Sequence, residues 1–223
     1  AAAAGGPVPY QVNGESFTGY YLSPADRAPL VLLVHDWDGL TDYEVKRAQM
    51  LAQLGYAVFA VDLFGTGIRP PATADKKRLT AQLYSDRTRM RALLQGGLEE
   101  ARKQGGNIAN SVAMGYCFGG SAVLEWARAG VDLKGFVSFH GGLETPVGQD
   151  YRAVNVSPRR VVIGLFRHRG LTPVISRRNG DDEQQQQQVK AWINHIKQSL
   201  AYVRSPGGKT GRGHCNPPAP AAG

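Results

Sequence analysis

Residues 8–22 alternate hydrophobic and polar positions around a tight turn. Val8–Val12 and Phe17–Leu22 flank Asn13-Gly14, a dipeptide that two-residue β-hairpin turns prefer. The chain is therefore predicted to open with an antiparallel hairpin. Continuous hydrophobic runs follow, which are typical of strands buried on both faces of a parallel sheet. These runs predict strands at Leu30–His35, Tyr56–Leu63, Ser111–Gly115, Leu133–His140 and Val161–Leu165.

Between these strands the hydrophobic residues recur with helical spacing. Thr41 is predicted to cap a helix from Asp42 to about Leu54, which has one hydrophobic face. Helical patterns also cover Thr73–Lys103, where Gly96-Gly97 predicts a break, and Ser121–Ala129 and Gln185–Leu200, with a last strand at Ala201–Arg204 if that helix ends early. Strands that alternate with helices predict an α/β fold with a mostly parallel central sheet flanked by helices. In such sheets the chemistry lies at the carboxyl ends of the strands.

The length of 223 residues suits a single α/β domain, which we expect over 7–205. Segment 1–6 contains only Ala and Gly, and 206–223 has no periodicity, so both are expected to be tails. No hydrophobic run approaches the ~20 residues that a membrane span needs. The two cysteines, Cys117 and Cys215, indicate neither a disulfide framework nor a metal site by their spacing. We expect a cytoplasmic protein, with export left open because the chain lacks an initial Met.

The positive charge is concentrated in the last third of the chain. Residues 1–150 carry 14 Lys and Arg against 15 Asp and Glu, whereas residues 151–223 carry 12 against 3. Three interpretations stay open. The segment could be a surface that binds phosphate or nucleic acid, a solvated face, or a stretch after Asp150 whose sequence departs from its ancestors through a frameshift or an error. No aromatic residues alternate with the arginines as base stacking requires, so we do not expect nucleic acid as a partner.

The segment Val112–Gly120 carries the clearest chemical signal. A hydrophobic run leads to Gly115-x-Cys117-x-Gly119 and then to a helical pattern, which is the strand–turn–helix arrangement of a nucleophile elbow. Glycines on either side allow the sharp turn, and the helix N-terminus favours negative charge on the sulfur or on a substrate oxyanion. The alternative is a buried cysteine in a glycine-rich turn.

Several motifs in order along the chain resemble the dienelactone hydrolase family of the α/β-hydrolase fold. Besides the hairpin, they are His35-Asp36-Trp37-Asp38-Gly39-Leu40, Leu54-Gly55-Tyr56-Ala57, Val61-Asp62-Leu63, Gly115-Tyr116-Cys117-Phe118-Gly119-Gly120 and Ser138-Phe139-His140-Gly141-Gly142. The resemblance covers about Val8 to Asp150. It implies a carboxymethylenebutenolidase-like hydrolase that acts on a small carboxylated lactone or ester, as in the degradation of aromatic compounds. We expect a monomer that acts on a small molecule without a metal or other cofactor.

The resemblance assigns roles to residues around the elbow. Cys117 would be the nucleophile that forms an acyl-enzyme, and the backbone N–H groups of Phe118 and Trp37 would form the oxyanion hole. Asp36 stands where the dienelactone enzyme has a glutamate that controls protonation of the cysteine. An aspartate is one methylene shorter, and the alternative for Asp36 is a loop carboxylate or helix cap.

The base and the acid of the triad come late in the chain. His214 is the predicted base because it follows the predicted last strand in a glycine-rich loop, whereas His140 is expected to pack. Asp182 is the predicted acid, with Asp181 beside it. The alternative for these two aspartates is a helix N-terminus before Gln184–Leu200.

A carboxylated substrate needs a cation and a donor near Cys117. Arg69, Arg78 and Arg87 are candidates for the cation, and Tyr84 is the candidate hydroxyl donor. Two further hypotheses stay open: a related hydrolase of altered ester or thioester specificity, and a scaffold of impaired activity whose basic C-terminal third binds an anionic partner. The sequence has no G-x-G-x-x-G after a strand and no Cys-x-x-Cys, so we expect no nucleotide or redox cofactor.

Overall fold

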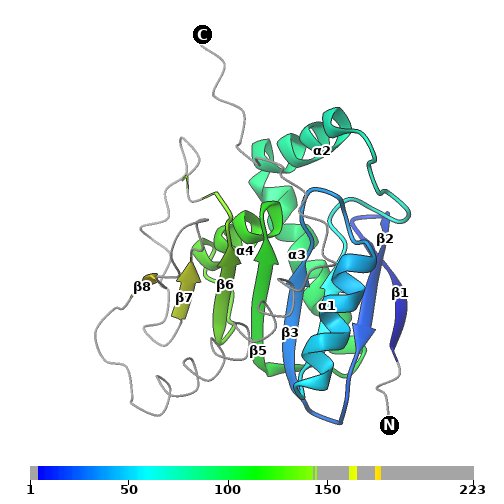
Figure 1. The fold of residues 1–223 in the computed structure, drawn as a ribbon, viewed down its shortest axis with the longest axis vertical. Helices are drawn as coiled ribbons and strands as arrows, with labels where there is room; N and C mark the ends of the chain where they lie inside the picture. The colour runs from blue at the N-terminus through cyan, green and yellow to red at the C-terminus, as the bar shows by residue number, and fades with distance from the viewer. Residues whose placement is uncertain (1–4, 143, 145–160, 165–173, 177–223) are drawn as a thin grey trace, which may run out of the picture.

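The computed structural model describes residues 5–142, 144, 161–164 and 174–176. Within these residues, eight strands form one sheet in the order β1-β2-β4-β3-β5-β6-β7-β8 (Figure 1). The central strands are parallel, while β1, β2 and β8 are antiparallel to their neighbours. The strands are β1 (Gly5–Val12), β2 (Glu15–Leu22), β3 (Pro29–Val34), β4 (Ala57–Val61), β5 (Asn107–Tyr116), β6 (Gly135–Phe139), β7 (Val161–Gly164) and β8 (Val174–Ser176). The predicted mostly parallel sheet with an N-terminal antiparallel hairpin is confirmed.

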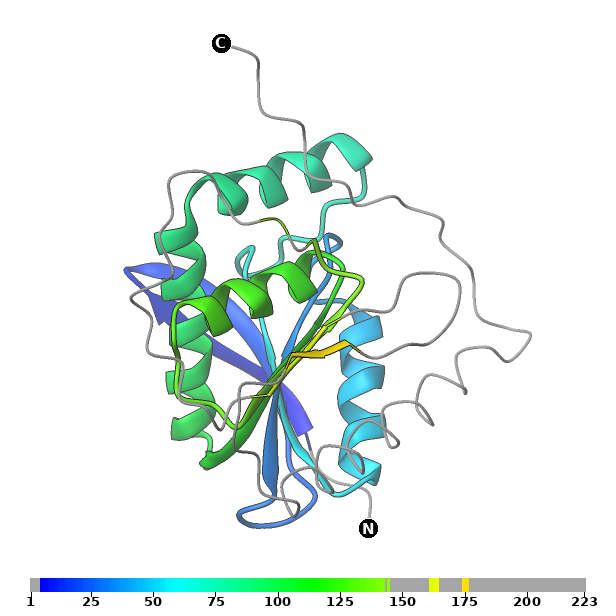
Figure 2. The ribbon, with the colours of Figure 1, turned by 90° about the vertical axis from the view of Figure 1, so that its left-hand side faces the viewer.

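Helices cover both faces of this sheet. They are α1 (Asp42–Gln53), α2 (Thr73–Ser85), α3 (Arg87–Lys103) and α4 (Phe118–Arg128). Seen along the sheet, α1 lies on one face, α3 and α4 lie on the other, and α2 lies across the end of the molecule (Figure 2). That end is where the central parallel strands finish (Figure 1).

The strand residues alternate between two hydrophobic cores. In β3, Leu30, Leu32 and Val34 belong to the core beneath α3 and α4, whereas Val31 and Leu33 belong to the core beneath α1. All five are fully buried, as the continuous hydrophobic run predicts for a strand covered on both faces.

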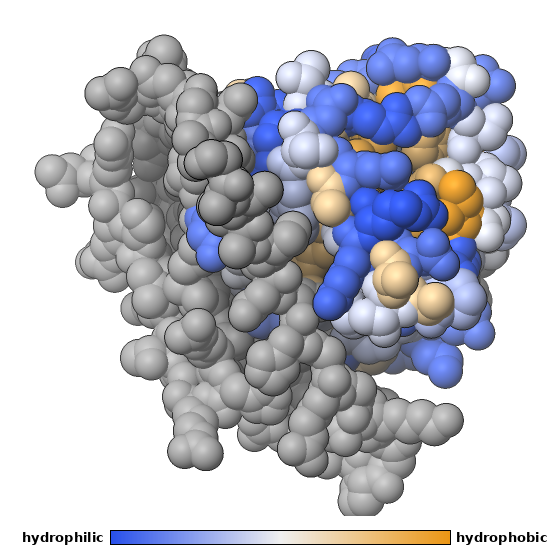
Figure 3. Space-filling view, turned by 90° about the horizontal axis from the view of Figure 1, so that it is seen from above, coloured by the Kyte–Doolittle hydropathy of each residue, from blue (hydrophilic) through white to orange (hydrophobic). Residues whose placement is uncertain are grey.

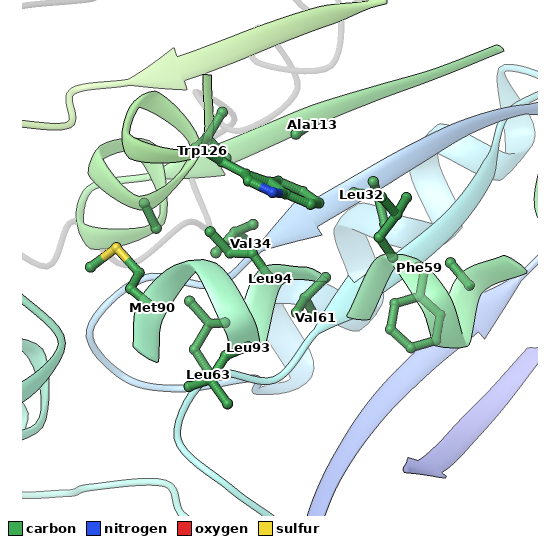
Figure 4. Packing of buried hydrophobic residues seen from close by; sticks show 14 of the residues in the cluster. Leu32, Val34, Phe59, Val61, Leu63, Met90, Leu93, Leu94, Ala113 and Trp126 are labelled. Carbon is green, nitrogen blue, oxygen red and sulfur yellow. The ribbon is translucent and has the colours of Figure 1, made fainter. Parts of the chain in front are cut away.

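Helix α3 supplies a large part of the first core. Its side chains Met90, Leu93 and Leu94 belong to the same core as Trp126 of α4, with Leu93 beside Leu63 and Leu94 beside Val34 (Figure 4). Each of these four side chains is at most 2% exposed. Burying such side chains contributes roughly 1.5–3 kcal/mol apiece to folding, so this contact fixes the position of α4, the helix that follows the predicted elbow.

The helical segment breaks at Asp86, and the prediction of a break at Gly96-Gly97 is wrong. The Asp86 carboxylate accepts a hydrogen bond from the N–H of Arg89 at 2.8 Å and so starts α3 as its N-cap. The two glycines stay helical and allow close packing on the sheet. A Cβ on Gly96 would lie 2.3 Å from Cγ2 of Val12, and a Cβ on Gly97 would lie 2.6 Å from Cγ1 of Val61.

Other element boundaries differ modestly from the prediction. Strand β1 begins at Gly5, so Gly5 and Gly6 pair with β2 and do not belong to a tail. Strand β5 begins at Asn107, and β8, which pairs antiparallel with β7, is not indicated by the sequence pattern. The predicted elements at 185–200 and 201–204 and the predicted tail at 206–223 lie outside the described residues.

Among the described residues, no helix combines the length and apolar character needed to cross a membrane.

Substituting Gly97 by alanine tests the packing of α3 on β4. Alanine favours a helix over glycine by about 1 kcal/mol, but overpacking a buried contact costs about 1–3 kcal/mol. Because Val61 is fully buried, we expect the clash to dominate and Gly97→Ala to lower the free energy of unfolding in urea. Gln95→Ala, at an exposed position of the same helix, is the matched control and should leave stability nearly unchanged. A Gly97→Ala variant at least as stable as the parent would contradict this packing.

Candidate active site

The candidate site lies where β3, β5 and β6 end. These strands are parallel neighbours, with Val34 opposite Gly115 and Tyr116 opposite Phe139, so the residues that follow them meet at one edge of the sheet. Asp36, Cys117 and His140 lie there, as the sequence predicts. The described surface seen from this end is largely hydrophilic, with hydrophobic residues between the polar ones (Figure 3).

His140 does not pack in the core, and that prediction is wrong. The side chain is exposed, and its backbone has a φ of 46°. It directly follows the last residue of β6, so the chain has already turned out of the sheet.

Cys117 occupies a sharp turn between β5 and α4. Its backbone has φ 52° and ψ −114°, a conformation that L-residues adopt only when the surroundings hold it. Its N–H donates to the carbonyl of Phe139 at 2.8 Å, and its carbonyl accepts from the N–H of Ser121 at 3.1 Å. The strand–turn–helix predicted around Cys117 is therefore present.

The glycines of the motif are required by contacts with backbone atoms. A Cβ on Gly115 would lie 2.3 Å from the carbonyl carbon of Gly119. A Cβ on Gly119 would lie 2.3 Å from the carbonyl oxygen of Val34 and 2.4 Å from that of His35. Because backbone atoms cannot rotate away as side chains do, the elbow allows no side chain at either position.

Aromatic residues on both sides of Cys117 anchor the turn in the two cores. Tyr116 belongs to the core beneath α1, where its ring stacks on Phe139 at a centroid distance of 4.7 Å. Phe118 belongs to the opposite core, where it packs against Tyr84 at 5.5 Å and Phe64 at 5.6 Å. Cys117 itself is 5% exposed.

Cys117 is disulfide-bonded in this structure, and its partner lies outside the described residues. The spacing of the cysteines does not indicate this bond. Thiolate chemistry at Cys117 therefore refers to the reduced protein.

Residues 36–38 follow β3 in a tight turn, and we call them the oxyanion loop after the role that the family resemblance predicts for Trp37. The N–H of Asp38 donates to Oδ1 of Asp36 at 2.8 Å, and the N–H of Gly39 donates to the Asp36 carbonyl at 3.4 Å. Among the described residues no acceptor is found for the N–H of Trp37. The N–H of Phe118, the first residue of α4, belongs to the turn whose N–H groups have no partner within a helix.

His35 holds the start of this loop as a neutral side chain. Its Nε2 accepts a hydrogen bond from the N–H of Leu63 at 3.0 Å, so Nδ1 carries the proton and donates to the Asp36 carbonyl at 2.6 Å. Complete burial lowers the pKa of His35 because charge is costly away from water. His35 therefore links the ends of β3 and β4 and is not available as a general base.

Asp36 uses one carboxylate oxygen to close the turn. Burial raises the pKa of Asp36, while the hydrogen bond from Asp38 and the charge of Lys76 act in the opposite direction. This contact matches the loop-carboxylate alternative for Asp36. The predicted base His214 and acid Asp182 lie outside the described residues, so their positions relative to Cys117 stay predictions.

Tyr84, the predicted hydroxyl donor, lies beside the elbow. Its ring packs against Phe118, and the side chain of Ser121 on α4 is close enough to act on the pKa of its hydroxyl. Burial raises the pKa of Tyr84, so the hydroxyl keeps its proton at neutral pH. Arg87, a candidate cation, lies 4.9 Å from the centre of the Tyr84 ring and 3.9 Å from the buried Glu125 carboxylate.

The other two candidate cations each pair with a carboxylate of the protein. Arg78 pairs with Asp75 at 3.2 Å on the exposed surface of α2. Arg69 lies 3.9 Å from the buried carboxylate of Asp62 and donates to the carbonyl of Ile68. The described contacts place neither guanidinium beside Cys117.

Two residues that sequence reasoning missed lie at this site. Glu44 forms a capping box with Thr41, which the spacing Thr41-x-x-Glu44 could have revealed. Lys76 of α2 forms an ion pair with Asp38 and lies 5.5 Å from the centre of the Trp37 ring. No local pattern predicts the Lys76 contacts because they join segments that are distant in the sequence.

Glu44 is a buried acid close enough to Asp36 to feel its charge. Its Oε2 accepts from the N–H and hydroxyl of Thr41 at 2.8 and 2.9 Å, while Oε1 is buried without a hydrogen-bond partner in the described part of the chain. Burial, together with the charge of Asp36, raises the pKa of Glu44 to about 7.

In the part of the chain that the structure describes, no group of three or more His, Cys, Asp or Glu could hold a metal ion.

Replacing Glu44 by glutamine should change how stability depends on pH. The folded protein binds the Glu44 proton more tightly than the unfolded chain, whose pKa is 4.5. The resulting stabilisation is full below pH 4.5 and is lost as pH rises through 7. Glutamine keeps an acceptor for the capping box and does not titrate. Between pH 5 and 8 we therefore expect Glu44→Gln to gain about 2–3 kcal/mol in unfolding free energy relative to the parent, measured by urea denaturation.

Asp42→Asn, in the same helical turn but exposed, is the control for this experiment and should follow the parent. Identical pH dependence in Glu44→Gln and the parent would contradict the raised pKa.

Comparison with known proteins agrees with this fold. The chain is similar to the structure of m3DLH, with 31% identity and a TM-score of 0.63 over 66% of this chain and 63% of that chain. It is also similar in fold to a dienelactone hydrolase-like promiscuous phosphotriesterase from metagenomic libraries, with 24% identity and a TM-score of 0.63 over 90% and 79% of the two chains.

A cold-adapted esterase from an Arctic intertidal metagenomic library shares the fold at 19% identity, with a TM-score of 0.53 over 62% of this chain and 61% of that chain. The chain thus spans less than two thirds of the length of m3DLH. No curated protein matches the chain significantly. Residues 17–159, more than half of the sequence, match the family model described as the dienelactone hydrolase family. The chain therefore belongs to the dienelactone hydrolase family.

Proposed function

We propose that the protein is a carboxylic ester hydrolase that opens a small carboxylated lactone or a related ester through an acyl-enzyme on Cys117. The observation that carries this proposal is the backbone of Cys117, which has a φ of 52° between β5 and the first residue of α4. A strained turn of this kind presents a nucleophile at the edge of the sheet where substrates bind. Membership of a hydrolase family supports the reaction type.

The first half of the proposed reaction transfers the acyl group to sulfur. The Cys117 thiolate attacks the carbonyl carbon, and the carbonyl oxygen becomes an oxyanion. The C–O bond to the leaving oxygen then breaks, leaving a thioester, and the leaving oxygen takes a proton from the His214 imidazolium. In a lactone this oxygen stays attached through the ring that has opened.

The second half of the reaction returns the enzyme. His214 removes a proton from water, which attacks the thioester and releases the carboxylic acid and the Cys117 thiolate. Asp182 would orient the imidazole and stabilise its charged form. Every proton and electron pair is accounted for by substrate, water and these side chains, so the proposed reaction uses no cofactor.

The N–H groups of Trp37 and Phe118 are proposed to stabilise the oxyanion. Trp37 lies in the loop after β3, and Phe118 is the first residue of α4. A single such donor typically contributes about 3 kcal/mol of transition-state stabilisation. The adjacent helix N-terminus adds a favourable field for negative charge.

Substrate recognition is proposed to use the Tyr84 hydroxyl. Tyr84 is the predicted binding residue that lies beside the elbow, through its contacts with Phe118 and Ser121. Arg69 and Arg78 stay proposed binding residues for the substrate carboxylate. To bind it, Arg69 would exchange its contact with Asp62, and Arg78 its contact with Asp75, for the substrate.

The second candidate function is hydrolysis of a different ester or a thioester. The hydrogen bond from the Asp38 N–H to the Asp36 carboxylate favours it, because an aspartate engaged in the loop turn is poorly suited to control the thiol as the family glutamate does. Under this alternative the elbow chemistry is unchanged and the preferred acyl group differs. Reduced activity, with an anionic partner bound by residues after Asp150, remains the third hypothesis.

Loss of the thiol tests the proposed nucleophile. Under reducing conditions, hydrolysis of cis- and trans-dienelactone and of a series of 4-nitrophenyl esters and acyl thioesters is measured for the parent, Cys117→Ala and His214→Ala. We expect kcat/KM to fall by roughly 10³-fold or more in both variants, because a nucleophile and its base act as one unit. Which substrate the parent prefers decides between the first and second candidates.

Cys215→Ser is the matched control, since Cys215 is the other cysteine of the chain, and it should retain the activity of the parent. Hydrolysis by Cys117→Ala at the rate of the parent would show that the proposed nucleophile is wrong.

A further inference from the structure

We propose that Lys76 is a positioning residue that holds the oxyanion loop, residues 36–38, in its active geometry and ties that loop to α2. This inference rests on the proposed function, in which the N–H of Trp37 contacts the developing oxyanion. Lys76 itself touches neither the substrate nor Cys117 in this proposal.

The Lys76 side chain contacts the loop at two neighbouring residues. Its ammonium forms an ion pair with Oδ1 of Asp38 and lies 5.5 Å from the centre of the Trp37 ring. The Lys76 side chain is 18% exposed, so most of its surface is covered. Ion-pair and cation–π contacts made by one ammonium restrict both side chains at once.

The loop is closed by its own hydrogen bonds on the other side. Asp36 accepts the N–H of Asp38 with its carboxylate and the Nδ1–H of His35 with its carbonyl. The peptide of Trp37 lies between these two anchored residues. Fixing the Asp38 side chain from outside therefore limits the rotation of the Trp37 N–H.

The same ammonium acts on Asp36 through its charge. Burial disfavours the Asp36 carboxylate, and the positive charge of Lys76 opposes that effect. The ionised carboxylate is the stronger acceptor for the Asp38 N–H that closes the turn. Lys76 thus supports the loop both by direct contact and by keeping its closing hydrogen bond strong.

Other cations of α2 do not make these contacts. Lys77 is exposed, and Arg78 pairs with Asp75 of the same helix. Partly exposed ion pairs add little to global stability, so removing Lys76 should leave the protein folded. A small displacement of an oxyanion donor, by contrast, can cost about 10²-fold in rate.

The decisive variant is Lys76→Met in the full chain, with Lys77→Met as the matched control. Under the reducing conditions of the ester assay, we expect kcat of Lys76→Met to fall about 10- to 100-fold while KM changes less than about 3-fold, because the loop acts on the transition state. Lys76→Arg should restore most of kcat. Lys77→Met should match the parent, and all variants should share its urea midpoint.

A double-variant comparison tests whether Lys76 acts through Asp38. If it does, the loss of kcat in Lys76→Met combined with Asp38→Asn should be clearly smaller than the product of the two single losses. Two losses of kcat that multiply in full would overturn the connection between Lys76 and Asp38. A Lys76→Met enzyme with the kcat of the parent, beside an inactive Cys117→Ala, would overturn the inference while leaving the proposed function intact.

Hydrogen exchange decides the inference without any catalytic readout. The Asp38 N–H is protected by its bond to Asp36, so exchange in a peptide that spans residues 36–39 should become faster in Lys76→Met and stay unchanged in Lys77→Met. Unchanged exchange in Lys76→Met would overturn the inference even if the parent proved inactive toward every ester.

Discussion

The backbone of Cys117 is the constraint on which the site depends. A φ of 52° is held there because β6 accepts the Cys117 N–H and because α4 approaches β3 until Gly119 meets the carbonyls of Val34 and His35. These contacts bring β3, β5, β6 and α4 to one point. The conformational strain at Cys117 is therefore opposed by packing that the whole sheet shares.

The two hydrophobic cores hold the residues on either side of Cys117 in place. Tyr116 and Phe118, on either side of Cys117, are buried in opposite cores, so neither face of the sheet can move without moving the elbow. His35 extends the same order to the next loop, because its neutral ring joins the Asp36 carbonyl to the Leu63 N–H. The proposed oxyanion donors are thus set mainly by buried hydrogen bonds, and Lys76 adds support from α2.

The sequence predicted those features that depend on local pattern. Each of three patterns is typical of a single local structure: the continuous hydrophobic runs, the Asn13-Gly14 hairpin and the glycine spacing around Cys117. The Gly96-Gly97 pair led to a wrong prediction. Glycine commonly indicates a helix break, whereas these two glycines let α3 pack closely against Val12 and Val61. Lys76 and Asp38 meet only through tertiary structure, which no spacing encodes. Asp182 and His214 remain predictions, since they follow the segment where the family pattern ends.

The most direct test of the account is to identify the residue that carries the acyl group. The reduced protein is mixed with an activated ester, quenched in acid during turnover, and examined as intact protein and as peptides by mass spectrometry. The account predicts one added acyl group, located on the peptide that contains Cys117 and removed by hydroxylamine. An acyl group on another residue during turnover would contradict the central claim that this elbow cysteine is the nucleophile.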